Sequence, residues 1–315
     1  MDVMTSGRQS VLEGVEFGIG TWAWGDRLFW GFGQKYQEND IREAFNYCLQ
    51  VGLNFFDTAE IYGQGRSESF LGEFLKTTSQ DVKIATKFAP FPWKIGKRVL
   101  IKSLRNSLKR LGLARVDLYQ MHFPIPFLKI EPWMEAMADA YQSGLVGAVG
   151  VSNYDRSQTQ RAFDTLTRLG VNLASNQVEY HLLDRTIEKN GLLAQCKAMG
   201  VAVIAYSPLA QGALTGKYTA ENPPSGVRGG RYNRKYLAQI QPLIMQLKKS
   251  GAAHAGKTPA QISLNWVMRK GAIPIPGAKN IDQAEMNAGA LGWALSDEEV
   301  QQLDEISDRV GKGSS

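Results

Sequence analysis

The chain has 315 residues, of which 43% are hydrophobic and 21% are charged, and its formal net charge is +6. This is an ordinary globular composition, and the chain is long enough to bury a large core. Lys and Arg are spread along the sequence with Asp and Glu between them, which favours a mildly basic solvated surface over a nucleic-acid site.

No apolar run reaches the ~18 residues of a membrane span, and residues 1–14 lack the apolar region of a signal peptide. The two cysteines, Cys48 and Cys196, fall on apolar faces of predicted helices and show no metal-binding spacing. We interpret them as buried reduced thiols. The expectation is a cytoplasmic protein without a metal site or a membrane partner, either a monomer or a weak homo-oligomer.

Helical and strand-like patterns alternate from the first apolar segment onward. Phe17-Gly18-Ile19-Gly20 predicts a short strand, and apolar residues between 41 and 49 recur at helical spacing. Asp40 with Glu43 resembles the capping box that begins a helix, and Gly52 is placed to end it.

The same alternation continues to the end of the chain. Further strands are predicted over residues 53–57, 82–87, 116–122, 148–151, 174–178, 201–206 and 272–275. Further helices are predicted over 67–76, 100–111, 133–142, 156–169, 187–199, 258–268 and 281–291, with a C-terminal helix capped by Ser296 and Glu299 that ends near Val310.

Eight strands, each followed by a helix except for one insertion after the seventh, predict an α/β fold with parallel strands and right-handed crossovers. At this length we expect closure into a (β/α)8 TIM barrel. An open doubly wound sheet is the alternative, and residues 18–23 partly match its Gly-rich dinucleotide turn. No helical pattern follows that turn directly, so we interpret the match as chance.

Two further segments fall outside the repeat, within what we expect to be one domain over residues 1–315. Residues 1–14 form a leader, and a hairpin in this region would close the bottom of the barrel. Residues 208–255 form a long insertion, in which 236–250 has a helical pattern. Insertions of this length inside a compact domain are usually functional.

Polar residues gather where the predicted strands end, the edge at which barrels of this kind carry their chemistry. Asp57 ends the second strand, Lys87 the third and His122 the fourth, and Tyr62 follows Asp57 by five residues. Each residue alone has a structural explanation: an Asp that caps a helix, a solvated Lys, or a hydrogen-bonded core His. Because the second and third strands are neighbours in this fold, we interpret the four as one group.

The group has a chemical use. A phenol has a reference pKa near ~10, which is too high for efficient acid–base work at neutral pH. An ammonium beside the phenol lowers that pKa, and a carboxylate beyond the ammonium holds it charged and oriented. A neutral imidazole donates a hydrogen bond to a carbonyl oxygen without adding a charge. We therefore predict a site that polarises a carbonyl group and supplies a proton to it.

Motifs at the strand ends resemble the aldo-keto reductase superfamily over about residues 15–295, nearly the whole chain. The resemblance is carried by Asp57-Thr58-Ala59-Glu60-Ile61-Tyr62-Gly63, Thr86-Lys87, Met121-His122, Gly147-Ala148-Val149-Gly150-Val151-Ser152-Asn153-Tyr154, Asn176-Gln177-Val178-Glu179-Tyr180, Ala205-Tyr206-Ser207-Pro208-Leu209 and Ile275-Pro276-Gly277-Ala278-Lys279-Asn280.

The resemblance implies roles for the four polar residues. Tyr62 would protonate the carbonyl oxygen, Lys87 and Asp57 would tune Tyr62, and His122 would orient the substrate. It also implies hydride transfer from NADPH to an aldehyde or a ketone.

The resemblance further implies an NADP site on the rim and under the insertion. The residues implied to bind the cofactor are Ser152, Asn153, Gln177, Tyr206, Ser207, Leu209, Gly212, Leu214, Gly216, Lys217, Gly277, Ala278, Lys279, Gln283 and Asn287. Lys279 favours NADP over NAD because it is placed to meet a 2′-phosphate. Met286 departs from the family, since many members carry an acidic residue there to hold adenine.

Aromatic residues after the strands predict an apolar substrate pocket for aromatic aldehydes or pyridoxal, although some of these rings have the alternative role of covering the barrel end. The predicted pocket residues are Trp22, Trp30, Phe88, Trp93 and Phe123. Motifs around the first and last strands resemble plant and cyanobacterial members of the superfamily, pyridoxal reductases included, and this resemblance makes pyridoxal a candidate substrate. A permissive reductase of aromatic or apolar aldehydes and ketones is the alternative.

Two other functions are compatible with a barrel of this kind. Channel-associated β subunits share this fold and keep the cofactor, so a regulatory protein with little turnover stays open. An unrelated metal-dependent lyase would need a cluster of metal ligands, and the three histidines, His122, His181 and His254, are far apart in the sequence.

Overall fold

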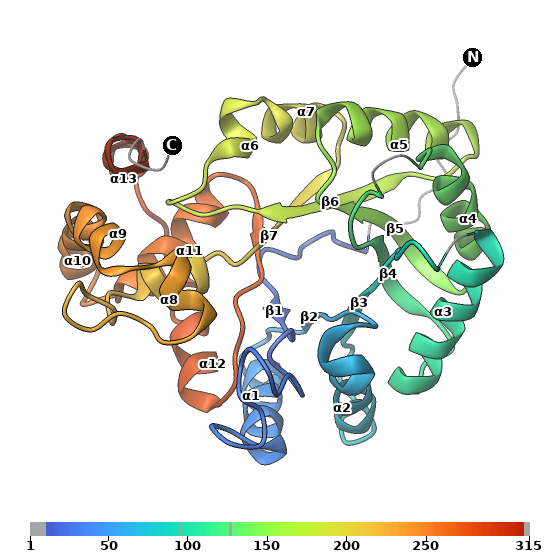
Figure 1. Ribbon diagram of the computed structural model, residues 1–315, viewed down its shortest axis with the longest axis horizontal. Coiled ribbons are helices and arrows are strands. Elements are labelled where there is room, and N and C mark those ends of the chain that lie inside the picture. The colour runs from blue at the N-terminus through green and yellow to red at the C-terminus, as the bar shows by residue number, and fades with distance from the viewer. Residues whose placement is uncertain (1–10, 95, 126–127, 312–315) are drawn as a thin grey trace.

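The computed structural model describes residues 11–94, 96–125 and 128–311. Eight strands form one sheet in chain order, each parallel to the next, and helices surround it (Figure 1). The strands are β1 (Ile19–Gly20), β2 (Phe55–Asp57), β3 (Lys83–Phe88), β4 (Val116–Met121), β5 (Val146–Ser152), β6 (Leu173–Glu179), β7 (Ala202–Tyr206) and β8 (Ile273–Pro274).

The helices outside the sheet are α1 (Glu38–Gln50), α2 (Arg66–Leu75), α3 (Lys97–Leu111), α4 (Glu131–Gln142), α5 (Arg156–Arg168), α6 (Thr186–Lys189), α7 (Leu192–Ala198), α11 (Pro259–Arg269), α12 (Ile281–Ala288) and α13 (Asp297–Gly311). The insertion after β7 contains a 3-10 segment, η2 (Ala210–Thr215), and the helices α8 (Val227–Arg231), α9 (Arg234–Gln239) and α10 (Gln241–Ala253). The predicted (β/α)8 barrel with this insertion and a C-terminal helix is confirmed.

The sheet closes because β1 lies beside β8. The N–H groups of Gly18 and Gly20 donate to the carbonyl oxygens of Pro274 and Pro276 at 3.0 and 2.9 Å. A Cβ atom on Gly20 would lie 2.8 Å from the Ile275 carbonyl oxygen, too close for any side chain. These glycines therefore serve strand packing, in agreement with the interpretation that their match to a dinucleotide turn is chance.

The start of one helix and the continuity of another differ from the prediction. Gln37 caps α1, and Asp40 is its third residue, accepting a hydrogen bond from the Gln37 N–H at 2.7 Å. Asp40 is thus the second member of a capping box rather than its first. The helix predicted over residues 187–199 is divided into α6 and α7 at Asn190 and Gly191.

The helical pattern predicted over residues 236–250 is also divided. α9 ends at Gln239, and α10 begins one residue after Ile240 with Pro242 in its first turn. Proline lacks the N–H group that a helix interior needs but fits a first turn, so it separates the two helices here.

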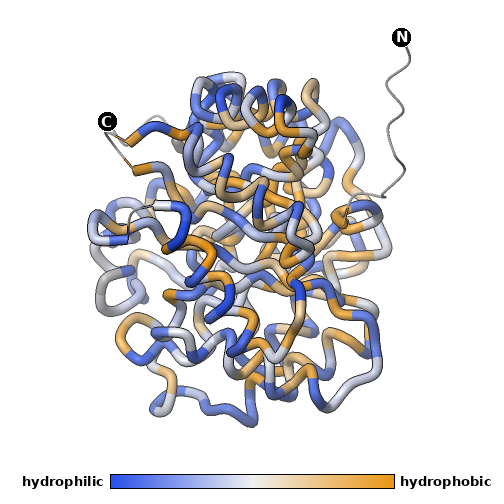
Figure 2. Tube along the Cα trace, turned by 90° about the vertical axis from the view of Figure 1, so that its right-hand side faces the viewer, coloured by the Kyte–Doolittle hydropathy of each residue, from blue (hydrophilic) through white to orange (hydrophobic). Residues whose placement is uncertain are grey.

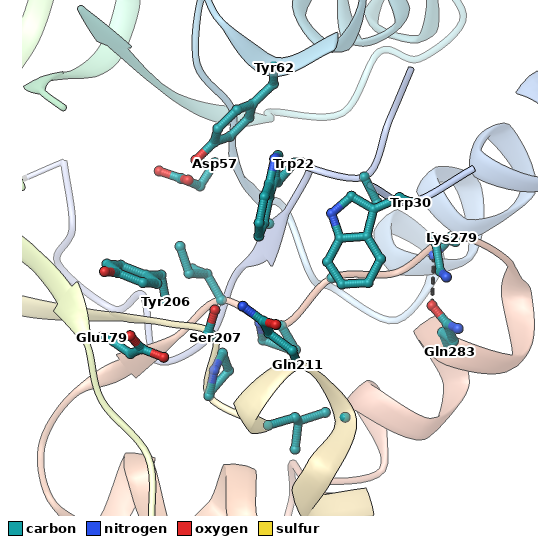
Figure 3. A pocket seen from close by; sticks show the side chains of 18 of the residues that line it. Trp22, Trp30, Asp57, Tyr62, Glu179, Tyr206, Ser207, Gln211, Lys279 and Gln283 are labelled. Carbon is teal, nitrogen blue, oxygen red and sulfur yellow. Dashed lines mark hydrogen bonds between the residues drawn. The ribbon is translucent and has the colours of Figure 1, made fainter. Parts of the chain in front are cut away.

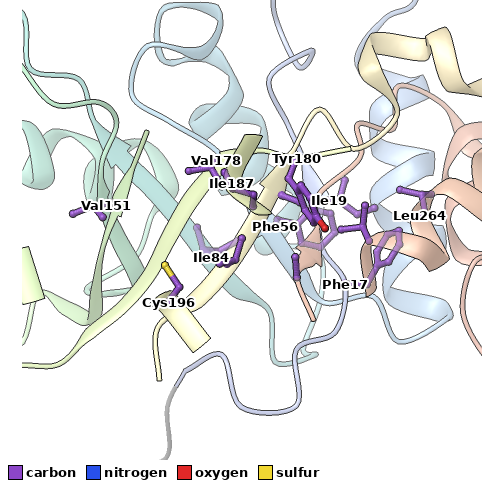
Figure 4. Packing of buried hydrophobic residues seen from close by; sticks show 14 of the residues in the cluster. Phe17, Ile19, Phe56, Ile84, Val151, Val178, Tyr180, Ile187, Cys196 and Leu264 are labelled. Carbon is purple, nitrogen blue, oxygen red and sulfur yellow. The ribbon is translucent and has the colours of Figure 1, made fainter. Parts of the chain in front are cut away.

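The interior of the barrel has an apolar layer below and a polar layer above. Residues two apart on a strand point to the same face. The apolar layer includes Phe55, Ala85 and Leu118, and the polar layer, two positions later on the same strands, contains Asp57, Lys87 and Gln120. Intervening residues such as Phe56 and Ile84 point outward into the helix-facing core (Figure 4). The polar layer thus lies at the carboxyl ends of the strands.

The described end of the leader closes the bottom of the barrel. Residues 11–14 form a turn, and Leu12 is buried in the apolar layer with Phe55 and Ile204. The predicted hairpin falls largely on residues 1–10, which lie outside the described residues.

Hydrophobic and hydrophilic residues alternate along the outer helices (Figure 2).

Basic and acidic residues are mixed less evenly along the chain than the sequence analysis predicts. The segment from Val82 to Val116 holds ten Lys and Arg residues and one Asp, Asp117 lying just beyond it, while the rest of the chain holds 26 basic and 30 acidic residues. The net positive charge of the chain therefore comes from this segment, which contains α3.

Within the described part of the chain, none of the helices has both the length and the apolar character required to cross a membrane. The same residues contain no group of three or more His, Cys, Asp or Glu side chains arranged to hold a metal ion.

Candidate active site

Lys87 is the centre of a buried polar group at the carboxyl ends of the strands. Its Nζ donates hydrogen bonds to Asp57 Oδ1, to the Thr58 carbonyl oxygen at 2.8 Å and to Tyr62 Oη at 3.3 Å. The side chains of Lys87 and Asp57 are 0% and 2% exposed, so water does not screen this ion pair. Tyr62 comes from η1 (Tyr62–Gly65), the turn between β2 and α2. The structure therefore brings three of the predicted catalytic residues into direct contact.

The charges of this group follow from burial and pairing. Burial lowers the pKa of Lys87, but Asp57 and Tyr62 raise it by more, so the net pKa lies above the usual value and the ammonium stays charged. Burial raises the pKa of Tyr62, Lys87 lowers it and Asp57 raises it, with a net increase. The predicted lowering of the Tyr62 pKa is therefore wrong in net direction, although Lys87 acts in the predicted sense. Tyr62 carries its proton at neutral pH.

His122 faces Tyr62 from the end of β4. The two rings meet edge to face with centroids 5.7 Å apart. Burial, and then the charge of Lys87, lowers the pKa of His122 to about 3, so the imidazole is neutral. Its Nδ1 is buried and has no hydrogen-bond partner among the described residues. A neutral ring with an unsatisfied nitrogen beside a protonated phenol is suited to bind a polar atom of a ligand.

A pocket of about 750 Å³ opens beside this group, within the usual range for sites that bind small molecules. Tyr62 and Asp57 lie toward one end, Lys279 and Gln283 lie toward the other, and Trp22 and Trp30 lie between them (Figure 3). We call these the catalytic end and the cationic end.

Most residues predicted to bind a cofactor line this pocket. They are Ser152, Asn153, Gln177, Tyr206, Ser207, Leu209, Gly212, Lys217, Gly277, Lys279 and Gln283. The ring of Tyr206 is held in place by its hydroxyl, which donates to Asn153 Oδ1 at 3.0 Å. These positions derive from the ends of four strands, β5 to β8, and from the insertion, and the barrel brings them together.

Four predicted cofactor residues do not line the pocket. Leu214, Ala278 and Asn287 are fully buried behind it. The Asn287 amide donates to the Gly277 carbonyl oxygen at 3.2 Å, so this side chain supports a lining residue. Gly216 caps η2 in a left-handed conformation.

Of the predicted substrate residues, some line the pocket and others do not. Trp22, Trp30 and Phe123 line the pocket. Phe88 is fully buried against Trp133, with ring centroids 5.5 Å apart. Trp93 is 78% exposed and stacks on Phe91 outside the lining. Phe88 therefore belongs to the helix-facing core, and Trp93 lies on the surface outside the pocket lining.

Sequence reasoning did not predict several lining residues. Glu179, at the end of β6, forms an ion pair with Arg231 of α8 at 2.8 Å. Arg228 of the same helix donates to Tyr218 Oη at 3.1 Å and lies over Trp30. The two arginines lie in the part of the insertion before residue 236, which has no periodicity, so no pattern places them. Glu179 carried a signal, because it lies within the strand-end motif that contains Gln177.

The cationic end has no carboxylate that pairs with its cations among the described residues. Burial, and then the charges of Arg228, Lys217 and Lys35, lowers the pKa of Lys279 to about 8. The ammonium of Lys279 lies 5.2 Å from the ring centres of both Trp30 and Tyr36. Aromatic faces stabilise this cation in part, but only an anion would neutralise the cluster.

Comparison with known proteins assigns the chain to a class. Residues 16–308 match the model of the aldo/keto reductase family, and the chain belongs to this family. Family membership makes it an oxidoreductase of the carbonyl-reducing class, and the resemblance stated from the sequence is confirmed.

Three relatives illustrate the match. The chain is 38% identical to the chloroplastic pyridoxal reductase of Arabidopsis thaliana over 91% of this chain and 81% of that protein. It is 31% identical to the L-glyceraldehyde 3-phosphate reductase of Escherichia coli (strain K12) over 88% and 86% of the two chains. An aldo-keto reductase from Klebsiella pneumoniae, solved in complex with NADPH, superimposes with a TM-score of 0.73 at 29% identity, covering 93% of this chain and 90% of that one.

Proposed function

We propose that this protein transfers hydride from NADPH to aldehydes and ketones, with Tyr62 as the proton donor. The observation that carries the proposal is the contact of Lys87 with both Asp57 and Tyr62 beneath an open pocket. A protonated phenol whose oxygen accepts a hydrogen bond from a buried ammonium can release its proton at that oxygen while the cation stabilises the phenolate that forms.

The pocket fits NADPH at both ends. Ser152, Asn153 and Gln177 supply polar groups beside the Tyr206 ring, as a carboxamide and a flat ring require. Lys217, Arg228 and Lys279, for which the described part of the chain provides no paired carboxylate, supply positive charge at the cationic end, as phosphates require. Bound NADPH would supply the hydride. The NADPH complex of the Klebsiella pneumoniae relative supports the same assignment.

The cofactor residues that we propose are those predicted from the sequence, with two kinds of role. The eleven that line the pocket would contact NADPH. Leu214, Gly216, Ala278 and Asn287 would hold the lining in place. We further propose that the insertion over residues 208–255 covers the cofactor, since Leu209, Gly212, Lys217 and Arg228 all line the pocket from it.

The chain's own residues have distinct tasks at the catalytic end. Tyr62 holds the proton at Oη, and Lys87 holds that oxygen and stabilises negative charge on it. His122 stays neutral and offers a hydrogen bond to a carbonyl oxygen without repelling Lys87. Trp22, whose ring centroid lies 6.5 Å from that of Tyr62, helps to exclude water.

Aromatic aldehydes or pyridoxal are the substrates that the catalytic end suits best. Trp22, Ile61 and Phe123 line it together with Tyr62 and neutral His122. Aromatic faces of this kind pack against flat apolar rings. The pyridoxal reductase name of the Arabidopsis thaliana relative supports pyridoxal as a candidate.

Replacement of Tyr62 tests the proposal. Tyr62→Phe should keep NADPH binding, measured by fluorescence, and lose about 10²–10⁴-fold in turnover of 4-nitrobenzaldehyde and pyridoxal. Tyr47→Phe, on α1 and away from the pocket, should behave as wild type. Unchanged turnover in Tyr62→Phe would reject the proton-donor role. A wild-type protein that binds NADPH tightly but reduces no carbonyl in a broad screen would favour the regulatory alternative.

Cellular location and assembly state stay predictions. The Arabidopsis thaliana relative is named chloroplastic, so the cytoplasmic location expected from the sequence has no support from that comparison.

A further inference from the structure

Gln120 has a fully buried side-chain amide in the polar layer, and it has no part in the proposed carbonyl reduction as described above. Its Nε2 donates to Asp57 Oδ2 at 3.1 Å, and its Oε1 accepts from Gln177 Nε2 at 3.4 Å. Gln177 Nε2 also donates to Asp57 Oδ2, at 2.8 Å. The three side chains therefore form a closed triangle of hydrogen bonds beside the Lys87–Asp57 ion pair.

The strand register creates the space for this triangle. Gln120 pairs with Lys87 on β3 and with Gly150 on β5. A Cβ atom on Gly150 would lie 3.1 Å from Gln120 Cγ and would collide with Ser175 Oγ. Glycine at position 150 thus leaves room for a long amide on the neighbouring strand, and the packing holds that amide in one place.

The triangle fixes which atom Gln177 presents to the pocket. Gln177 lines the pocket, and both hydrogen bonds of its Nε2 go to the triangle. Its Oε1 accepts no hydrogen bond from any described residue and is the atom left for a ligand. The carboxylate of Asp57 and the carbonyl oxygen of Gln120 both only accept, so each selects the NH2 group of Gln177. The contact with Gln120 adds a second point that holds the plane of the Gln177 amide.

We propose that Gln120 is a positioning residue, which orients Gln177 so that its carbonyl oxygen accepts from the nicotinamide carboxamide and which links that contact to Asp57. The inference rests on the proposed function, because it requires NADPH as the ligand of Gln177. Through Asp57 Oδ2 the same residue also holds the carboxylate that pairs with Lys87. Binding of the nicotinamide and the position of the Lys87–Asp57 ion pair would then both depend on the amide of Gln120.

Binding of two cofactors tests this role without relying on turnover. NADPH has a carboxamide N–H for Gln177 Oε1, and the reduced 3-acetylpyridine analogue of NADPH has a methyl group there instead. The wild type should bind NADPH about three- to tenfold more tightly than the analogue, the contribution of one hydrogen bond. Gln120→Met, which fills a similar volume without an amide, leaves only Asp57 to hold the Gln177 amide and should discriminate less between the two cofactors. Fluorescence titration measures the four dissociation constants.

Controls separate positioning from general damage. Asn265→Leu removes a buried amide that binds the backbone of Ala290 and Trp293 away from the pocket, and it should keep the discrimination between the two cofactors. Gln120→Asn, which keeps a shorter amide, should retain part of the discrimination and serves as the second variant if Gln120→Met does not fold.

The outcomes separate the inference from the function on which it rests. Full discrimination in Gln120→Met, or equal loss of affinity for both cofactors, would overturn the role of Gln120 and leave the proposed function intact. A wild-type protein that binds neither cofactor would instead overturn the proposed function.

Discussion

Lys87 and Lys279 lie at opposite ends of one pocket and differ in their partners. Lys87 is completely buried, contacts Asp57 and has a raised pKa. Lys279 is partly buried among Arg228, Lys217 and Lys35, and its pKa is lowered to about 8. Among the described residues no carboxylate pairs with Lys279.

The difference indicates what each cation is for. A buried charge that already has a protein counter-ion acts on its neighbours, here Tyr62. A cluster of like charges without a counter-ion is unfavourable until an anion arrives. The catalytic end is therefore complete within the protein, whereas the cationic end is complete only with a ligand. Four predictions test whether the two ends of the pocket differ in this way.

The largest effect is expected at Lys87. Lys87→Met leaves the Asp57 carboxylate buried without its cation, which should lower the free energy of unfolding by about 3–5 kcal/mol and abolish carbonyl reduction. Adding Asp57→Asn removes the unpaired charge and keeps an oxygen that can accept from Gln120 and Gln177, so the double variant should recover most of that stability without recovering activity. Urea unfolding at neutral pH measures the stabilities.

One result for these two variants would contradict the prediction. If the double variant is as unstable as Lys87→Met alone, the loss arises from packing and not from an unpaired carboxylate, and the description of the catalytic end as a self-contained ion pair is wrong.

The sequence allowed the catalytic end to be predicted much better than the cationic end, for a physical reason. Asp57, Lys87 and His122 each occupy the end of a strand, and strand ends follow from periodicity. Gln120 could have been found by the same rule, because it lies two residues after Leu118 on the inner face. It was missed because a buried amide within an apolar strand was not interpreted as part of a site.

The cationic end depends on long-range packing that periodicity does not describe. Arg228 lies in an insertion whose course over the pocket is set by contacts such as the ion pair that Arg231, of the same helix, forms with Glu179. The net direction of the Tyr62 pKa could not be read from the sequence either, because it depends on how deeply the phenol is buried. Neighbours can be inferred from the fold, but burial depth cannot.

The second prediction concerns Lys279. Lys279→Ala should weaken NADPH binding by about 10- to 100-fold, the contribution of a hydrogen bond to a charged group, and should leave NADH binding nearly unchanged. Stability of the cofactor-free protein should stay equal or increase, since a repelled cation is removed. Lys249→Ala, on the exposed face of α10, is the matched control. Equal weakening of NADPH and NADH would show that Lys279 does not meet the 2′-phosphate.

The third prediction tests substrate charge. The catalytic end offers aromatic rings and a neutral imidazole. Among the residues that the structure describes, its one ammonium is that of Lys87, buried against Asp57, and the nearby Arg231 is paired with Glu179. A phosphate group would therefore find no free cation there. We expect kcat/KM for pyridoxal to exceed that for pyridoxal 5′-phosphate by at least about tenfold, the effect of roughly 1.4 kcal/mol. Equal values would place a free cation at the catalytic end and break the distinction.

The smallest effect is expected from pH at the cationic end. Lys279 has a pKa of about 8 without a ligand, and a bound phosphate would raise it. Binding therefore takes up a proton above pH 8, so affinity should be constant below that pH and decrease as the pH rises. Between pH 7 and pH 9 the dissociation constant for NADPH should increase by up to about tenfold, and that for NADH should not. Lys279→Ala should remove the dependence, whereas a dependence that persists in this variant would assign it to another group. Because Lys87 is held charged by Asp57, no matching change should arise from the catalytic end in this range.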